Sequence, residues 1–279
     1  MKIKSLIPIL IFAVLLAGCA KKTSTSGTTP TPAGAGTKIL VNELPMDQRP
    51  FVALVPHETG KLFTFYAENA DKASAATLDL EYQSGDLLKG ARSTLTPPIS
   101  NPYTKAIILG SCSTGGKCTF DSDLKSGTMK FSLNFTGVAA TNVLKGDFTF
   151  ITGQNNLPDG KFTFAPAKSK IPNNIIMGNS FGIPKSAGKD IYLYPVVLTS
   201  ASDKNITGTL TIADTSVTSI EIYDGQSYQP LKFTKKDNSL VINLDQKPWS
   251  KSATITRDDI KGTQETVNLN VVGPIVLFK

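Results

Sequence analysis

The segment KFSLNF at residues 130–135 alternates polar and apolar side chains without a break. Because successive side chains of a β-strand point to opposite faces, this period of two places the apolar residues on one side of a sheet and the polar residues on the other. The segments SIEI at residues 219–222 and SLVINL at residues 239–244 repeat the pattern. These three segments predict half-buried strands and decide the fold class.

Similar short runs continue along the chain beyond about residue 50. Val, Ile, Thr, Phe and Tyr dominate these runs, and Gly, Asn, Asp, Pro and Ser fill the gaps, which is typical of antiparallel strands joined by tight turns. The runs occupy residues 51–55, 62–66, 77–82, 106–109, 147–151, 161–164, 191–198, 208–212, 252–256, 266–271 and 275–278. Residues 67–76 are the one candidate for a short helix. The sequence therefore predicts an all-β protein.

The chain beyond residue 38 is long for one domain and suits two. Strands at this spacing are typical of β-sandwiches. The clearest break in periodicity lies around Pro166–Asn174, where the chain is polar and contains prolines. We therefore predict two consecutive antiparallel β-sandwich domains, at residues 38–166 and 172–279.

The first of these domains carries a family resemblance. Leu78–Tyr82 (LDLEY), followed by Ser84–Leu88 (SGDLL), resembles the cohesin-type strand in which an alternating run ends in Tyr before a turn and a pair of Leu. Residues 127–135 and 143–150 resemble the strands that close that sandwich. The resemblance implies a nine-strand, jelly-roll-like sandwich that binds proteins or sugars and performs no chemistry. Another immunoglobulin-like sandwich is the alternative for both domains.

Residues 1–18 predict an export signal. Residues 6–17 are almost wholly apolar, which fits a signal peptide and is too short for a membrane-spanning helix. The segment ends in Leu16-Ala17-Gly18-Cys19, which resembles the lipobox of bacterial lipoproteins. The resemblance implies cleavage before Cys19 and a lipid anchor on its sulfur, with fatty acyl chains such as palmitate. It places the protein on the cell membrane or the outer membrane, at the extracytoplasmic face.

Residues 19–37 read CAKKTSTSGTTPTPAGAGT. Such a segment of Ser, Thr, Gly, Pro and Ala cannot bury enough apolar surface to offset the entropy lost on ordering. We expect a flexible tether between the lipidated cysteine and the globular part of the chain.

The charge of the chain excludes one class of partner. The formal net charge is +7, and loss of the segment that contains Lys2 and Lys4 lowers it to about +5. The basic residues are scattered, whereas nucleic-acid binding needs a clustered basic patch. We expect no nucleic-acid partner, and no motif calls for a cofactor.

Two cysteines remain beyond the lipidation site, Cys112 and Cys118, within GSCSTGGKCTF at residues 110–120. In an oxidising compartment, a close pair across a Gly-Gly turn predicts a disulfide. The bond either stabilises a hairpin tip or holds a binding loop in one shape.

The motifs that suggest catalysis are weak. His57 is the single histidine, which removes most metal-site and triad chemistry, and its turn sequence predicts exposure to solvent. Residues 178–182 match G-x-S-x-G, but Ile183-Pro184 follows instead of a helix and no histidine lies downstream. Residues 186–189 match S-x-x-K but lead directly into a strand. We expect no enzymatic activity.

Paired carboxylates are the remaining candidates for chemistry or for metal binding. Asp121 and Asp123 form a weak Ca²⁺ candidate beside the predicted disulfide, because Ca²⁺ takes several oxygen ligands from one loop. Asp258 and Asp259 are a second pair suited to acid–base work. Turn aspartates without a ligand are the alternative for both pairs.

Three aromatic residues are candidates for contact with a ligand. Trp249 is the only tryptophan, and Tyr223 and Tyr228 flank a turn at Asp224-Gly225. Exposed aromatic rings serve as stacking platforms for sugars, whereas a packed core is the alternative place for Trp249.

These observations favour a membrane-anchored, extracytoplasmic lipoprotein with a non-catalytic role. We expect binding or envelope scaffolding through contacts with an envelope protein or a polysaccharide. A carboxylate-based hydrolase that acts on polysaccharide and a purely structural envelope spacer are the alternatives. A hydrolase needs a cleft with at least two convergent acids, which a binding module does not.

Overall fold

Residues 130–134 of the segment KFSLNF lie in β9 (Leu124–Asn134), the third strand from one edge of a long sheet. A computed structural model describes residues 37–279 apart from 115, 154, 168–173 and 258–261, and residues 37–279 form one compact unit. The predicted signal peptide, Cys19 and the tether to residue 36 lie outside the described residues. No helix among the described residues is long and apolar enough to cross a bilayer.

The described chain is all-β, as predicted, with one short 3-10 turn, η1 (Met46–Gln48). Its strands are β1 (Lys38–Val41), β2 (Phe51–Pro56), β3 (Leu62–Glu68), β4 (Ala75–Ser84), β5 (Leu87–Leu95), β6 (Tyr103–Ile108), β7 (Gly110–Cys112), β8 (Cys118–Phe120), β9 (Leu124–Asn134), β10 (Ala140–Ile151), β11 (Asn155–Asn156), β12 (Phe162–Pro166), β13 (Ile175–Asn179), β14 (Tyr192–Ser200), β15 (Ile206–Ile212), β16 (Ser219–Tyr223), β17 (Tyr228–Pro230), β18 (Thr234–Lys236), β19 (Ser239–Gln246), β20 (Trp249–Arg257) and β21 (Thr263–Phe278). The helical candidate at residues 67–76 is wrong, because the end of β3, a turn and the start of β4 occupy it.

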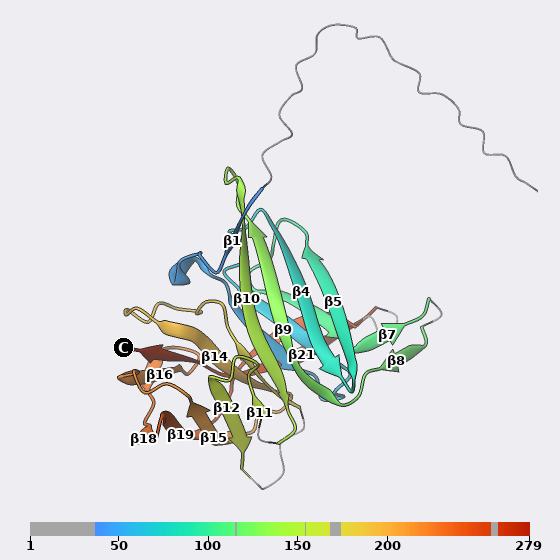
Figure 1. Ribbon diagram of the computed structural model, residues 1–279. Helices are drawn as coiled ribbons and strands as arrows, with labels where there is room; N and C mark the ends of the chain where they lie inside the picture. Colours follow the sequence, from blue (N-terminus) through green and yellow to red (C-terminus); the bar gives the residue numbers. More distant parts are fainter. Residues whose placement is uncertain (1–36, 115, 154, 168–173, 258–261) are drawn as a thin grey trace, which may run out of the picture. The chain divides into compact units, whose positions relative to one another are not determined.

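The strands form four sheets (Figure 1). The long sheet has the order β17-β16-β21-β14-β13-β10-β9-β4-β5, with β1 beside β10 and β20 beside β21. The inner sheet is β2-β3-β6, the C-terminal sheet is β11-β12-β15-β19-β18, and β7 pairs with β8 in a hairpin. All pairs are antiparallel except that of β1 with β10.

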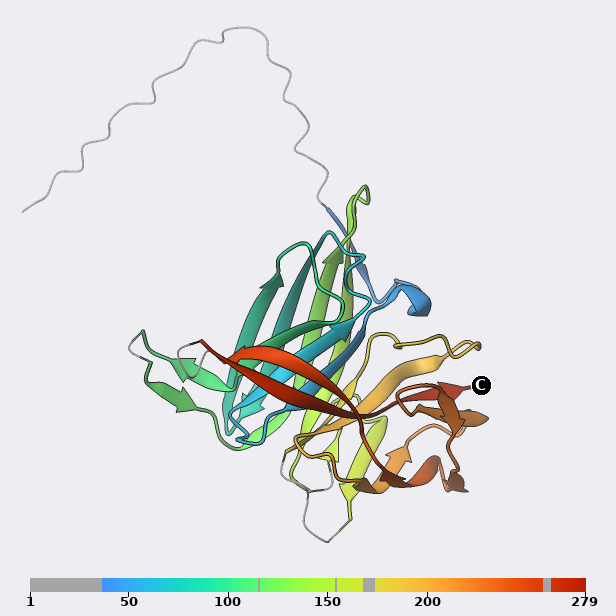
Figure 2. The ribbon, with the colours of Figure 1, turned by 180° about the vertical axis from the view of Figure 1, so that it is seen from behind.

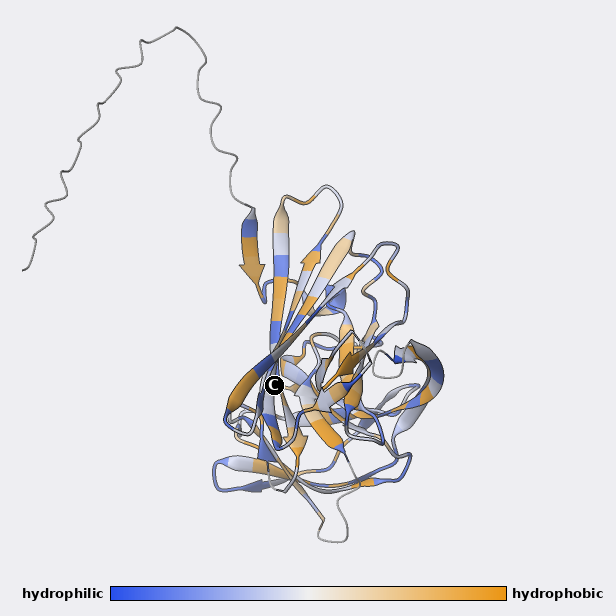
Figure 3. Cartoon of the chain, turned by 90° about the vertical axis from the view of Figure 1, so that its right-hand side faces the viewer, coloured by the Kyte–Doolittle hydropathy of each residue, from blue (hydrophilic) through white to orange (hydrophobic). Residues whose placement is uncertain are grey.

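One half of the long sheet packs its apolar face against the inner sheet. In β4 the residues Ala76, Leu78, Leu80 and Tyr82 are buried, while the residues between them point outward. Phe131 of β9 belongs to the same core cluster. The strict alternation of sequence thus produces a sheet with one apolar and one polar face, visible as alternating bands in Figure 3.

The other half of the long sheet packs its opposite face against the C-terminal sheet. Ile151, Met177 and Leu198 face this second core, together with Phe164 and Leu210 of the C-terminal sheet. In β13, Ile176 faces the first core while its neighbours Ile175 and Met177 face the second. At β10 and β13, the covered face of the long sheet therefore changes. On one side of these strands the inner sheet covers one face, and on the other side the C-terminal sheet covers the opposite face.

Strands β2 and β3 of the inner sheet are buried on both faces. Phe63 and Phe65 face the first core, whereas Phe51 and Tyr66 face a third cluster with Val271 of β21. Figure 2 shows the long β20–β21 hairpin, in orange-red and red, crossing over the inner sheet on this side. Because both faces are covered, every residue of β2 is buried.

Strands on the two sides of the predicted boundary at residues 166–172 are neighbours in one sheet. Phe148 of β10 pairs with Gly178 of β13, and the pairing extends from there to β14 and β21. The structure thus has two sandwich-like cores, and one sheet contributes to both of them.

Candidate functional site

A cavity of about 910 Å³ lies on the polar face of the long sheet, beside the turn between β11 and β12. We call it the groove. It is lined by Asp79, Leu80, Glu81, Gly90, Ala91, Arg92, Thr128, Met129, Lys130, Lys145, Gly146, Asp147, Asp159, Lys161, Asn179 and Tyr194. Its volume falls within the range of about 300–1,000 Å³ that is usual for small-ligand sites.

Strand register builds the floor of the groove. Glu81 of β4 pairs with Thr128 of β9, and Thr128 pairs with Asp147 of β10. The backbone N–H of Asp147 donates a hydrogen bond of 2.9 Å to Oδ1 of Asn179 on the next strand. Outward positions of four adjacent strands therefore form one polar row across the sheet.

A second row is made of charged residues. Oδ1 of Asp79 lies 3.3 Å from Nε of Arg92, and Oδ2 lies 3.8 Å from Nζ of Lys130. Lys145 pairs with Lys130 in the register of β9 and β10. Asp79 thus has two cationic neighbours, Arg92 and Lys130. Lys145 adds a further positive charge to the lining of the groove.

The surroundings of Asp147 raise the pKa of this groove acid. Burial raises its pKa above the ordinary value of 3.8, and the negative charge of Asp159 raises it further, against a hydrogen bond from the backbone of Asp159. Asp159 itself accepts a hydrogen bond of 2.9 Å from the backbone N–H of Lys161, which fixes its turn. The charge of Asp159 therefore acts on the carboxyl group of Asp147 inside the cavity.

A smaller cavity of about 450 Å³ continues the groove, since it shares Asp159, Lys161, Asn179 and Tyr194 with it. The hydroxyl of Tyr194 is buried and has no hydrogen-bond partner in the described part of the chain. Burial raises the pKa of Tyr194, and the charge and hydrogen-bonding capacity of the Arg49 side chain, whose guanidinium lies 5.3 Å from the ring centre, oppose that effect. Tyr194 and Arg49 are thus polar side chains that lie beside each other at this end.

The structure brings the three predicted aromatic residues together. The ring of Tyr223 lies 5.3 Å from that of Tyr228 and 6.1 Å from that of Trp249. Trp249 also contacts Phe51 and donates a hydrogen bond of 2.6 Å from Nε1 to the carbonyl oxygen of Gly273. None of the three lines the cavities described above. Their role in ligand contact stays a prediction.

The two aspartates of the Ca²⁺ candidate have different surroundings. Asp121 accepts a hydrogen bond of 2.8 Å from the hydroxyl of Tyr82 and lies 3.4 Å from Nζ of Lys89. Asp123 is exposed and lies 3.5 Å from Nζ of Lys125. Among the described residues no group of three His, Cys, Asp or Glu could hold a metal ion. The pair Asp258 and Asp259 lies outside the described residues.

The disulfide predicted between Cys112 and Cys118 is present, and it joins β7 to β8. The hydroxyl of Ser180, in the G-x-S-x-G match, is fully buried and donates to the carbonyl of Gly182 at 2.8 Å. It also accepts a hydrogen bond of 3.0 Å from the backbone N–H of Val52. Ser180 therefore joins β2 to the end of β13 and does not face solvent.

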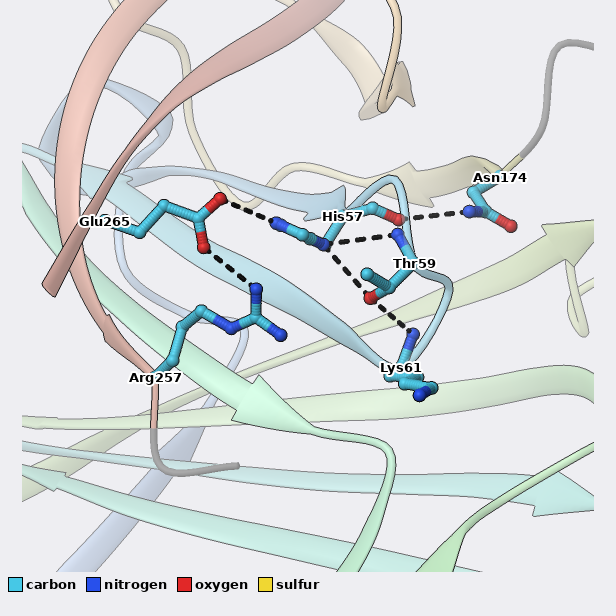
Figure 4. A network of polar contacts seen from close by, with 6 residues as sticks. All are labelled: His57, Thr59, Lys61, Asn174, Arg257 and Glu265. Atoms are coloured by element: carbon cyan, nitrogen blue, oxygen red, sulfur yellow. Dashed lines mark hydrogen bonds and ion pairs between the residues drawn. The ribbon is translucent and has the colours of Figure 1, made fainter. Parts of the chain in front are cut away.

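His57 is only 12% exposed, whereas its turn sequence predicted exposure to solvent. Its Nε2 lies 3.2 Å from Oε1 of Glu265, whose other oxygen accepts a hydrogen bond of 3.0 Å from Arg257 (Figure 4). Burial alone would raise the pKa of Glu265, but these two bonds and the charges of both partners lower it below 4.5. Asn174 donates to the carbonyl oxygens of His57 and Glu58, which holds the β2–β3 turn in place.

Sequence reasoning did not select the groove residues. Asp79, Glu81 and Asp147 stood at outward positions of predicted strands, and only the strand order brings them into one row. No family model matches the chain, and neither curated proteins nor solved structures show a match. The function must therefore be argued from the site itself.

Proposed function

We propose that the protein is a membrane-anchored, extracytoplasmic binding protein whose groove takes a hydroxyl-rich ligand such as a segment of polysaccharide. The observation that carries this proposal is the groove, where acids, bases and amides line a cavity open to solvent. Sugars are recognised by such planar polar groups, since each hydroxyl both donates and accepts. The lipobox resemblance at Cys19 supports the anchor and the extracytoplasmic address.

Binding is best tested by calorimetry with soluble oligosaccharides of known charge. Cellotetraose, chitotetraose and an oligogalacturonate are suitable neutral, amide-bearing and anionic probes. Tyr194→Phe removes one hydroxyl from the groove, and we expect about 3–10-fold weaker binding. Lys145→Ala removes a charged donor, and we expect a loss of at least about tenfold.

Lys236→Ala is the matched control for Lys145→Ala, because Lys236 is also exposed but lies on β18, away from the groove. The Lys236→Ala variant should bind each oligosaccharide with the affinity of the unmodified protein. Absence of binding to all three probes, or equal affinity of all variants, would refute the groove as a glycan site. The anchor is tested separately by labelling with a palmitate analogue, which Cys19→Ser should abolish.

Hydrolysis of the bound polysaccharide is a second candidate function, because several acids line the groove, Glu81 and Asp147 among them. Two strand spacings of about 4.8 Å place the backbones of Glu81 and Asp147 about 10 Å apart. Inverting glycosidases separate their carboxyl groups by about 6.5–9.5 Å. A protonated Asp147 would donate its proton to the leaving oxygen, while Glu81 would take a proton from the water that attacks the anomeric carbon.

Release of new reducing ends separates this candidate from simple binding. A hydrolase would release them from an oligosaccharide that binds, and Asp147→Asn and Glu81→Gln would each stop the release while retaining binding. Binding without any release, at acidic and neutral pH alike, would leave the binding protein as the function.

A further inference from the structure

A second polar cavity, of about 460 Å³, lies away from the groove. Three segments that are distant in the sequence form it: the end of β2 with the following turn, the loop after β14, and β21. Its lining consists of Val55, Pro56, His57, Glu58, Thr64, Ala201, Ser202, Asp203, Glu265, Thr266, Val267, Asn268, Leu269 and Asn270. We call it the acidic pocket.

Each of the three segments contributes one carboxylate. Glu265 is already engaged by His57 at 3.2 Å and by Arg257 at 3.0 Å. Glu58 and Asp203 are exposed, and neither forms an ion pair with another described residue. In a chain of net charge +7, this pocket is therefore a local site of uncompensated negative charge.

Two polar residues of low exposure, Thr64 and Asn270, also line the acidic pocket. Thr64 is 3% exposed, and its hydroxyl has no hydrogen-bond partner among the described residues. Asn270 is 2% exposed, and Oδ1 of its amide accepts a hydrogen bond of 2.6 Å from the hydroxyl of Ser250. Its Nδ2 donates to no described residue. Both residues line the cavity, so these polar atoms can contact a ligand or water in the pocket.

The wall that carries Glu58 is held in place before any ligand binds. Nδ2 of Asn174 donates to the carbonyl oxygens of His57 at 3.0 Å and Glu58 at 3.2 Å. The ring of His57 connects the same turn to Glu265 on β21 (Figure 4). A preformed wall lowers the entropy lost on binding.

We propose that the acidic pocket is a second ligand site, for a small molecule that carries both an ammonium group and hydroxyl oxygens. Glu58 and Asp203 supply the charge that an ammonium group needs, through charge-assisted hydrogen bonds. Nδ2 of Asn270 donates to a hydroxyl oxygen of the ligand, and the hydroxyl of Thr64 donates or accepts. The site is independent of the groove and of the polysaccharide proposed for it.

Calorimetry of the full-length protein with D-glucosamine tests this proposal, because D-glucose and N-acetyl-D-glucosamine are matched ligands without the positive charge. We expect glucosamine to bind at least about tenfold more tightly than either, with an affinity that falls as salt increases. The double variant Glu58→Gln, Asp203→Asn should weaken glucosamine binding by at least about tenfold. Thr64→Val should weaken it about threefold.

Two control variants show whether the change in glucosamine affinity belongs to the acidic pocket. Asp237→Asn removes an exposed carboxylate at the β18–β19 turn, where the backbone φ of 50° suits asparagine, and Lys145→Ala alters only the groove. Both should bind glucosamine as the unmodified protein does. The proposal is overturned by equal binding of the three sugars, by no binding of glucosamine at millimolar concentration, or by unchanged affinity in a double variant with native circular dichroism.

Discussion

Asp147 is an ionisable residue whose charge opposes folding. It is half-buried on β10, and both burial and the charge of Asp159 raise its pKa above 3.8. A raised folded-state pKa means that the folded protein holds its proton more tightly than the unfolded chain. Ionisation therefore destabilises the fold increasingly as the pH rises above about 3.8.

We predict that Asp147→Asn stabilises the protein at neutral pH. The amide keeps the shape of the side chain but removes the charge, so Tm at pH 7 should rise, by no more than about 4 °C in a chain of this size. The difference in Tm between variant and wild type should vanish below about pH 3.8. A thermal melt series by circular dichroism measures it, and an equal difference at every pH would contradict the argument.

The opposite pH dependence is expected at Glu265. Its pKa is below 4.5, so the stability that it contributes is present above pH 4.5 and is lost as the pH falls through the lowered value. Glu265→Gln should lower the free energy of unfolding at pH 7 by no more than about 1 kcal/mol, because a third-exposed ion pair is screened by solvent.

Urea unfolding at pH 7 and near pH 3 measures this effect. Gln264→Glu is a useful control, because it adds a carboxylate at the neighbouring exposed position of β21. A deficit of Glu265→Gln that persists unchanged near pH 3 would show that the lost interaction is packing and not charge.

At this scale the sequence predicts which side chains point outward but not which ones meet. The alternation in LDLEY correctly places Asp79 and Glu81 on the polar face of β4. Their neighbours Thr128 and Lys130 are about fifty residues away, and only the pairing of β4 with β9 brings them together. Likewise, the turn sequence around His57 carries no sign of Glu265, which approaches from β21.

Among the elements, the β7–β8 hairpin is the one that depends on a covalent bond. Each strand has three residues, and none of them is buried. A two-stranded hairpin this short is marginal without further support. The hydrogen bond from the backbone N–H of Asp121 to the carbonyl of Leu109 closes its base. Lys61 over the ring of Phe120 at 4.5 Å and the hydrogen bond from the N–H of Leu109 to the carbonyl of Lys61 connect it to the rest of the protein.

We predict that Cys112→Ser with Cys118→Ser loosens this hairpin and leaves both cores intact. Loop entropy limits the loss of global stability to about 2 kcal/mol. Hydrogen exchange in Gly110–Phe120 should accelerate, while exchange in β9 and β10 stays slow. Reduction of the wild type by dithiothreitol should reproduce the result, and unchanged exchange in the hairpin would show that its backbone contacts suffice.

Most strands could be predicted from the sequence, because the alternation of polar and apolar residues is a local pattern. The ends of the strands could not be predicted in this way. Residues 266–271 and 275–278 predicted two strands, separated by Gly273-Pro274. The structure has the single strand β21 across both, with register shifts against β14 near Val196. Gly273 has a φ of 101°, which suits glycine, and it accommodates the irregularity without ending the strand.

At the scale of the whole molecule, period alone could not show that β2 and β3 are buried on both faces. Residues 51–55 (FVALV) are continuously apolar, which fits a strand covered on both sides. What covers the second face is Val197 of β14 with Leu269 and Val271 of β21, from the other end of the chain. Such long-range packing follows from topology, which a single sequence does not specify.

This packing leads to a prediction about the two sandwiches expected from the sequence. We predict that residues 38–166 alone do not fold. Without residues 172–279, Phe51, Val55 and Tyr66 lose their cover, at about 1.5–3 kcal/mol for each side chain. That total is comparable with the about 5–15 kcal/mol by which folded domains are stable. The edge of β10 that pairs with β13 would also be left open.

Expression of residues 38–166 and of residues 38–279, followed by near-UV circular dichroism and thermal melts, tests this prediction. The longer chain should melt in one cooperative transition, because β10, β13 and β14 connect its two cores in one sheet. The shorter chain should lack a cooperative transition and bind a hydrophobic dye. A native-like, cooperatively melting fragment 38–166 would instead establish the first sandwich as an independent domain, and the shared sheet would then be an interface between two folding units.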